Sequence, residues 1–201
     1  DAGFTEGYKK KDTKKTDGSR SHFFSNFIMN FIDGQDKYSG LELNVEKTSN
    51  DTYFEVHDVK SSLIKGDKTI LENKEDFFYK NKDLFFGITP SVFEGTTKKG
   101  TKRLEYLLPL NLEKNIMTSE KYGFLDLGSN LIFRKYETNK HSDFFVNNFM
   151  WKSNKWLSTF GTESHFKGLV KAVNYETKNT NKYKDDKINS EAYSALGYFT
   201  K

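Results

Sequence analysis

Hydrophobic and polar residues alternate with a period of two along most of the chain. The alternation is clearest in three runs, Gly40–Lys47, Arg103–Glu113 and Leu125–Phe133, where every second residue is apolar or nearly so. Alternation sustained over about eight residues is typical of a half-buried strand. Around Leu71–Tyr79 the spacing is also compatible with a helix. The pattern therefore predicts a chain built almost entirely of strands.

Clusters of turn-forming residues separate the strand-like runs. They are Asp33-Gly34-Gln35-Asp36, Ser49-Asn50-Asp51, Lys65-Gly66-Asp67, Gly95-Thr96-Thr97, Glu137-Thr138-Asn139 and Ser153-Asn154-Lys155. Two longer polar connections are expected, Lys9–Gly18 and Glu176–Ser190. The runs between them predict roughly ten strands in an antiparallel up-and-down meander, several of them longer than the usual 5–6 residues. Tyr122–Tyr136 and Trp156–Tyr175 are expected to be very long strands, and a strand-like run, Tyr193–Thr200, lies next to the last residue.

The composition is both polar and rich in aromatic residues. Hydrophobic residues make up 35% of the 201 residues and the mean hydropathy is −0.78, yet aromatic residues reach 16%, with 19 Phe and 11 Tyr. A wide barrel with one wet face and one apolar face ringed by aromatic side chains has such a composition. A half-solvated antiparallel sheet has it too. Composition alone leaves both architectures open.

The length and number of the strands favour the barrel. So many long strands with so few aliphatic residues would be hard to bury in a soluble sandwich. We therefore expect an all-β fold, with residues 1–201 forming a single segment of an outer-membrane barrel domain. This segment would be an arc of a large transmembrane β-barrel, either unclosed or closed imperfectly. Barrel strands need only about 10 residues to cross a bilayer, so the lack of a long apolar run does not count against this fold.

Asp1-Ala2-Gly3-Phe4 shows no signal peptide and starts within a strand-like pattern, as a fragment would.

Charge and cysteine content exclude several classes of function. The 32 basic and 28 acidic residues give a formal net charge of +4, a mixed surface that indicates no nucleic-acid partner. The chain has 0 Cys, so it has no disulfide, no cysteine-ligated metal and no thiol chemistry. The four histidines, His22, His57, His141 and His165, have no metal-site spacing. No nucleophile elbow, phosphate loop or zinc-protease motif occurs. We expect no enzyme activity, no catalytic residue, no metal and no cofactor.

A basic cluster lies in the first long connection, at Lys9-Lys10-Lys11 and Lys14-Lys15. Such a cluster could bind lipid phosphates. A solvated loop is the more common role of a charge run in a connection.

Aromatic residues gather towards the ends of the strand-like runs, at Phe23-Phe24, Phe77-Phe78-Tyr79, Phe85-Phe86, Phe144-Phe145, and Trp151 with Trp156. Membrane barrels concentrate such rings at the two membrane–water interfaces; core packing in a soluble protein is the alternative. Neighbouring aromatic residues in a strand place one ring on each face. The second ring of each pair must therefore pack against a loop or in a lumen.

An ordered series of motifs resembles the barrel region of the lipopolysaccharide-assembly protein family LptD, also called organic solvent tolerance protein, particularly its alphaproteobacterial form. The motifs are Gly18-Ser19-Arg20-Ser21-His22, Lys47-Thr48-Ser49-Asn50-Asp51-Thr52-Tyr53-Phe54, Ser91-Val92-Phe93-Glu94, Arg103-Leu104-Glu105-Tyr106-Leu107-Leu108-Pro109, Gly123-Phe124-Leu125-Asp126-Leu127, Asn147-Asn148-Phe149-Met150-Trp151-Lys152-Ser153, Asn174-Tyr175 and Gly197-Tyr198-Phe199. Asn50, Phe93 and Leu104 depart from the family pattern. The order and spacing of these motifs carry the resemblance.

The resemblance implies an outer-membrane translocon that inserts lipopolysaccharide into the outer leaflet. In such a translocon a periplasmic jellyroll receives lipopolysaccharide from periplasmic bridge proteins. An LptE-type lipoprotein plugs the lumen, and lipid A leaves between the first and last strands of the barrel. The reaction is transport, without covalent chemistry or a cofactor. We expect the jellyroll and both seam strands to lie outside this chain, together with the family's cysteines. Pro109, inside a strand motif, is expected to mark a bulge or a weak position in the ladder.

Two other functions stay open. A general porin has the same architecture and a charged lumen, and would lack the upstream jellyroll. A soluble β-rich module that binds lipid or carbohydrate would stay soluble without detergent, whereas a barrel arc would aggregate through its apolar face and open edges.

Overall fold

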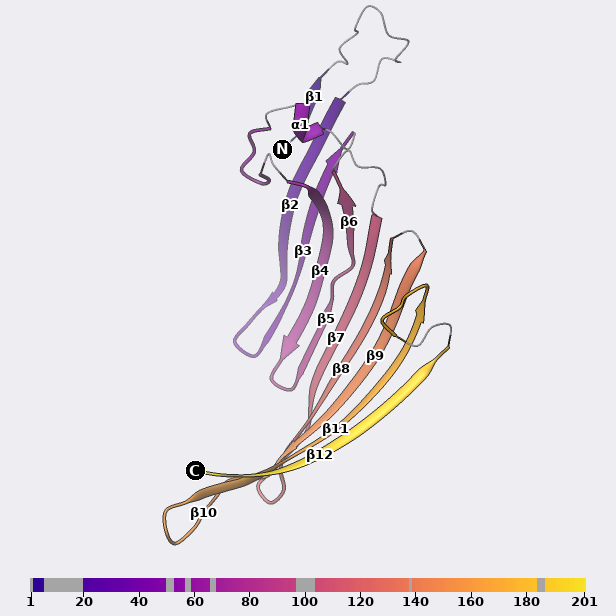
Figure 1. Ribbon diagram of the computed structural model, residues 1–201. Helices are drawn as coiled ribbons and strands as arrows, with labels where there is room; N and C mark the ends of the chain where they lie inside the picture. The colour runs from indigo at the N-terminus through magenta and orange to yellow at the C-terminus, as the bar shows by residue number, and fades with distance from the viewer. Residues whose placement is uncertain are drawn as a thin grey trace, which may run out of the picture.

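One curved antiparallel sheet makes up nearly all of the structure (Figure 1). The computed structural model describes residues 2–5, 20–49, 53–56, 59–65, 68–96, 104–137, 139–183 and 187–201. The elements are β1 (Ala2–Thr5), β2 (Arg20–Asp33), β3 (Lys37–Thr48), α1 (Tyr53–Val56), β4 (Ile70–Asn81), β5 (Leu84–Ile88), β6 (Ser91–Gly95), β7 (Leu104–Ser119), β8 (Gly123–Tyr136), β9 (Lys140–Lys152), β10 (Trp156–Leu157), β11 (Glu163–Lys178) and β12 (Asn189–Thr200). Within these ranges no helix is both long and apolar enough to cross a membrane. The chain is all-β apart from the single turn α1, as the period-two pattern predicts.

The 12 strands follow one another across the sheet in nearly their sequence order. Long hairpins join β2 to β3, β3 to β4, β7 to β8, β8 to β9, β9 to β11 and β11 to β12. β5 and β6 occupy one position, because both lie between β4 and β7. The predicted meander is therefore confirmed, with more strands than the sequence pattern suggests.

The break between β5 and β6 explains how two prolines fit in the sheet. Pro90 lies in the break, and its carbonyl accepts a hydrogen bond from the Glu75 backbone N–H at 3.0 Å. The Pro109 carbonyl faces the same break, where it accepts from the Thr89 N–H at 3.1 Å. Since the N–H and C=O of a strand residue point to the same side, the N–H that Pro109 lacks would also face this interrupted ladder. The β7–β8 register runs through Pro109 without a shift, and the bulge lies between Asn115 and Met117 instead.

Two expected boundaries are wrong. The run Trp156–Tyr175 is not one strand, because a tight turn at 158–162 folds β10 back onto the start of β11. Gly161, at φ 80°, lies in that turn. The connection expected at Glu176–Ser190 is shorter, because β11 continues to Lys178 and β12 begins at Asn189. The ambiguous stretch around Leu71–Tyr79 is strand β4.

Connections of different lengths lie at the two ends of the sheet (Figure 1). β3, β6 and β11 end, and β4, β7 and β12 begin, at one end of the sheet, with residues 49–69, 96–103 and 179–188 between them in the sequence; we call it the long-connection end. The connections after β2, β4 and β7 span 34–36, 82–83 and 120–122 and lie at the other, the short-turn end. Two connections depart from this trend, 137–139 at the long-connection end and 153–162 at the short-turn end.

Candidate functional site: the two faces of the sheet

The strand register divides the side chains into one apolar and one polar face. Leu110 lies opposite both Ile88 and Leu131, and Leu131 lies opposite Phe145, so these side chains share a face. We call it the apolar face; it also carries Phe27, Met29, Leu41, Leu43, Phe77, Leu108, Leu112, Leu127, Phe133, Phe149, Trp151, Val170 and Leu196. The polar face carries Asn26, Glu42, Asp76, Asn111, Glu113, Asn130, Asn148, Lys152, Lys167, Lys171 and Glu191.

No second layer covers the apolar face in the part of the chain that the structure describes. Phe133, Phe145 and Phe149 are 43%, 41% and 41% exposed, and Leu196 is 73% exposed. The buried hydrophobic residues among the described ranges are only Phe24, Tyr53, Ile64, Leu71 and Tyr175. An apolar surface that extends over so many strands needs an apolar partner, because soluble monomers rarely expose patches beyond a few hundred Å².

The apolar segment moves along the strands from one edge of the sheet to the other. One row of directly paired residues crosses nine strands, and we call it the central row: Met29, Leu41, Phe77, Ile88, Leu110, Leu131, Phe145, Asn174 and Ser190. The row is apolar up to β9 and polar on β11 and β12. On β3 the apolar residues continue towards the long-connection end, at Leu43 and Val45, whereas on β11 they lie towards the short-turn end, at Val170 and Phe166.

This displacement defines the slope of the apolar band. The centre of the apolar segment shifts by roughly seven residues between β2 and β12. With about 3.3 Å per residue and about 4.8 Å between strands, the band crosses the strands at roughly 30° from their perpendicular. The apolar segment of β8 from Leu125 to Phe133 is roughly 27 Å long on the same scale.

Aromatic side chains with polar groups lie at the short-turn end of the apolar face. The Trp151 indole Nε1 donates a hydrogen bond to the Tyr122 carbonyl at 2.8 Å, which fixes the ring at the turn. The Trp151 ring lies over Gly168, where an added Cβ would come within 3.4 Å of it. Trp156, Phe166 and Tyr198 form a cluster with ring centroids 5.2–6.2 Å apart. Of the predicted aromatic residues, Trp151 and Trp156 therefore lie near strand ends, whereas Phe77 and Phe145 lie in the central row.

The second ring of each aromatic pair packs on the polar face, as the strand geometry requires. Phe24 stacks on Phe54 of α1. Phe144 stacks on Tyr175, and Tyr183 of the following connection closes over both. The other two rings cover glycines, Phe78 at Gly40 and Phe85 at Gly87.

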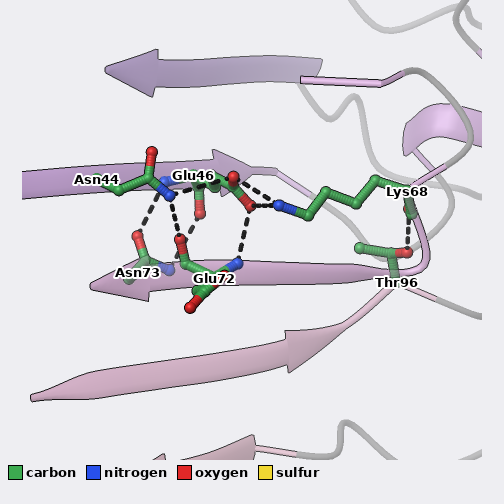
Figure 2. A network of polar contacts seen from close by, with 6 residues as sticks. All are labelled: Asn44, Glu46, Lys68, Glu72, Asn73 and Thr96. Carbon is green, nitrogen blue, oxygen red and sulfur yellow. Dashed lines mark hydrogen bonds and ion pairs between the residues drawn. The ribbon is translucent and has the colours of Figure 1, made fainter. Parts of the chain in front are cut away.

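A buried carboxylate holds the long-connection end of β3 and β4 together (Figure 2). Glu46 is 4% exposed; its carboxylate accepts hydrogen bonds from Lys68 Nζ at 2.6 Å and from the Glu72 N–H at 2.8 Å. The backbone pairing of β3 with β4 ends at Asn44 and Lys74, and beyond it the Asn73 side chain binds the β3 backbone instead. Its amide accepts a hydrogen bond from the Glu46 N–H at 3.0 Å and donates one to the Glu46 carbonyl at 3.1 Å. Thr96 Oγ1 donates to the Lys68 carbonyl at 2.9 Å, which ties in the end of β6. The network holds Lys68, and with it the β3–β4 connection, against the sheet.

That connection folds onto the polar face. Tyr53 Oη and His22 Nδ1 share a hydrogen bond of 2.8 Å, and the two rings meet edge to face. Ile64 packs with Phe24 and Leu71 in the small core, with Phe54 and Val59 beside them. Burial raises the pKa of the Tyr53 phenol above its ordinary value. The polar face is therefore partly covered at its long-connection end.

Both lateral edges of the sheet are open in the described ranges. β12 pairs with β11 and with no strand on its other side, while β1 covers only the first residues of β2. Tyr193, Leu196 and Tyr198 of β12 are 52–73% exposed. A long, exposed apolar edge of this kind is a template for pairing with another strand.

The sequence-predicted chemical residues are not brought together. His22, His141 and His165 lie on β2, β9 and β11, and His57 lies outside the described residues. Across the described ranges no three His, Asp or Glu side chains are close enough to hold a metal ion. The basic cluster of Lys9–Lys11 with Lys14 and Lys15 also lies outside the described residues. The candidate functional site is therefore the pair of sheet faces, which none of the sequence motifs indicates.

No protein-family model matches this chain, and no curated protein matches it.

Proposed function

We propose that this chain is an arc of an outer-membrane β-barrel whose apolar face contacts lipid and whose polar face lines a lumen. The observation that carries the proposal is the exposed apolar band and its slope of roughly 30° across the strands. Strands of outer-membrane barrels tilt by about 35–45°, and their apolar band is about 25 Å tall. Because the lipid layer is parallel to the membrane plane and the strands are tilted, the apolar band must cross the strands at an angle close to their tilt.

Three further features support a membrane barrel. Aromatic residues with polar groups, Trp151 and Tyr198, lie near one border of the band, where a membrane interface would be. Most of the longer connections lie at one end and most of the short turns at the other, a trend found in barrels with long extracellular loops and short periplasmic turns. The open edges of β2 and β12 would pair with further strands in a closed barrel.

We further propose that the barrel belongs to a lipopolysaccharide translocon of the LptD type. The ordered motifs from Gly18 to Phe199 support this assignment. The chain would then work in the cell outer membrane with an LptE-type lipoprotein plug, a periplasmic jellyroll and its bridge proteins, and it would move lipopolysaccharide without covalent chemistry. A soluble lipid- or carbohydrate-binding module would leave the exposed apolar face without a cover.

Site-specific photo-crosslinking in cells tests this function. A photoreactive residue at Asn130 on the polar face should cross-link lipopolysaccharide in transit, and the cross-link should disappear when lipopolysaccharide synthesis is blocked. The matched position is the neighbour Leu131, which lies on the apolar face. There the cross-link to bulk lipid should persist under the same block. A porin would give no lipopolysaccharide cross-link at Asn130 and would conduct ions in a planar bilayer, which would overturn the translocon assignment.

A further inference from the structure

Two lysines face one another on the polar face near the short-turn end. The register places Lys152 of β9 directly opposite Lys167 of β11. Side chains directly opposite in an antiparallel pair have Cβ atoms about 4.5–5.5 Å apart, and like charges there are destabilising. Lys171 lies on the same face of β11, opposite Asn148. The sheet therefore concentrates positive charge at this place at a cost in stability.

No carboxylate neutralises these lysines within the described part of the chain. The ion pairs there include none with Lys152, Lys167 or Lys171; Lys155, next to the group, is already bound to Glu163 at 2.7 Å. Asp126 lies one pair away on β8, opposite Met150, and accepts a hydrogen bond from Asn115 at 2.8 Å. Elsewhere the polar face is more acidic, at Glu42, Glu72, Asp76 and Glu113.

Aromatic rings of the edge strand β12 lie beside the lysines. Lys167 Nζ is 4.7 Å from the centroid of the Phe199 ring, and Lys171 Nζ is 5.7 Å from that of Tyr193. His165 stacks on Phe199 with centroids 5.3 Å apart, and its Nε2 is buried without a hydrogen-bond partner. Phe199 and Tyr193 are still 45% and 52% exposed. The two rings are six residues, or about 20 Å, apart along β12, so each offers its free surface to a different ammonium group.

We propose that Lys152 and Lys167, with the Phe199 ring beside them, form a binding site for a phosphorylated saccharide. The phosphate would lie between Lys152 and Lys167, where it would cancel their repulsion and accept charge-assisted hydrogen bonds from both. The sugar ring would lie on the exposed part of the Phe199 ring. The site rests on the proposed function only for the source of this ligand, which would be the phosphorylated sugar of a lipopolysaccharide passing the polar face.

Ligand-dependent unfolding of the whole chain in detergent micelles tests the site, because a ligand that binds only the folded state raises the unfolding midpoint. The probes are N-acetylglucosamine 1-phosphate, N-acetylglucosamine and inorganic phosphate, with sodium chloride at matched ionic strength. The sugar phosphate should raise the midpoint most, inorganic phosphate less, and the neutral sugar and chloride not at all. Lys152→Ala and Lys167→Ala should each weaken sugar-phosphate binding by about tenfold, the effect of losing about 1.4 kcal/mol. Lys167→Arg should retain binding.

Lys80→Ala is the matched control, since Lys80 lies on the polar face of β4; it should bind the sugar phosphate like the wild type. Without ligand, Lys152→Ala should unfold at a higher midpoint than the wild type, because one of two opposed charges is gone. If phosphate and chloride raise the unfolding midpoint equally, the lysines do not form a phosphate site. If inorganic phosphate and the sugar phosphate bind with equal affinity, the site does not recognise the sugar. A chain that inserts into bilayers but gains nothing from the sugar phosphate contradicts this site alone. A chain that binds it but does not insert contradicts the proposed barrel alone.

Discussion

Ser129 and Asn147 face one another in the middle of the apolar face, where Ser129 Oγ donates a hydrogen bond to Asn147 Oδ1 at 2.8 Å. Leu127 and Leu131 flank Ser129 along β8 on the same face. Each polar side chain therefore has its partner in the neighbouring strand. If the face contacts lipid, the pair is needed because hydrocarbon offers no other hydrogen-bonding group.

Breaking this pair should cost more than removing it. Ser129→Ala leaves the Asn147 amide unpaired and should lower the free energy of unfolding in a bilayer by about 1–2 kcal/mol. The double variant Ser129→Ala/Asn147→Leu should recover most of that loss, because no unpaired polar group is left. Urea unfolding of the two single variants and the double variant in lipid vesicles measures the coupling. Additive losses would show that the side chains face water.

Removing the ammonium beside Glu46 should be among the most damaging changes in the chain. Lys68→Met leaves a nearly buried carboxylate with only the Glu72 N–H and the Asn44 amide as donors. The expected loss is about 3 kcal/mol. The double variant Glu46→Gln/Lys68→Met should lose less than Lys68→Met alone, because the neutral amide can still accept from the Glu72 N–H. If denaturant unfolding shows that the double variant is less stable than Lys68→Met, then the unpaired charge of the Glu46 carboxylate is not the cause of the loss.

Gly123 should not tolerate a side chain. It has φ 88°, and an added Cβ would lie 2.1 Å from the Lys152 carbonyl oxygen and 2.8 Å from the Asn154 nitrogen, both of them backbone atoms. Gly123→Ala should therefore lower the free energy of unfolding by at least about 2 kcal/mol, the cost of left-handed backbone with the clash added. Gly161 is the control, because it has φ 80° but nothing within 4 Å of the added Cβ. Gly161→Ala should cost only about 1 kcal/mol, and equal losses would contradict the clash.

The Tyr53 phenol should make stability fall at high pH. Its pKa is raised by burial, so the folded state holds the phenol proton more tightly than the unfolded state, whose tyrosine pKa is about 10. The stability that comes from the neutral phenol is present below about pH 10 and is lost as the pH rises towards the folded-state pKa. Tyr53→Phe should cost about 1 kcal/mol at pH 7 through the lost hydrogen bond to His22. The difference between wild type and variant should shrink above pH 10, and a constant difference would contradict this role.

The strands with one exposed apolar face are the ones that the sequence predicts well. Gly40–Lys47 and Leu125–Phe133 lie within β3 and β8, and the described part of the run Arg103–Glu113, residues 104–113, lies within β7. A face that alternates in environment keeps the period of two. The turn in Trp156–Tyr175 is missed although Gly161 lies in it, since the hydrophobic alternation continues on both sides. Here the turn that contains Gly161 interrupts the strand, although the hydrophobic pattern shows no interruption.

The candidate site is less accessible to sequence reasoning. Glu46 reads as an ordinary polar residue of an alternating strand, and its burial depends on Lys68, which a separate connection brings back to it. The opposition of Lys152 and Lys167 depends on the register of β9 and β11, two strands that the missed turn at 158–162 separates in the sequence. Lys167 belongs to none of the motifs, and the motif that contains Lys152 does not indicate a charged site. Both features depend on pairings between distant parts of the chain.

Cysteine labelling along two neighbouring rows tests the central claim most directly. The chain has 0 Cys, so single cysteines can be placed at Leu110, Leu131 and Phe145 of the central row and at the adjacent polar-face positions Asn111 and Asn130. After reconstitution in vesicles, a fluorophore on each central-row cysteine should be quenched by a lipid-phase quencher and protected from a water-soluble one. Fluorophores at Asn111 and Asn130 should show the reverse. Equal quenching of both rows by the water-soluble reagent would contradict a lipid-facing apolar band, and with it the barrel.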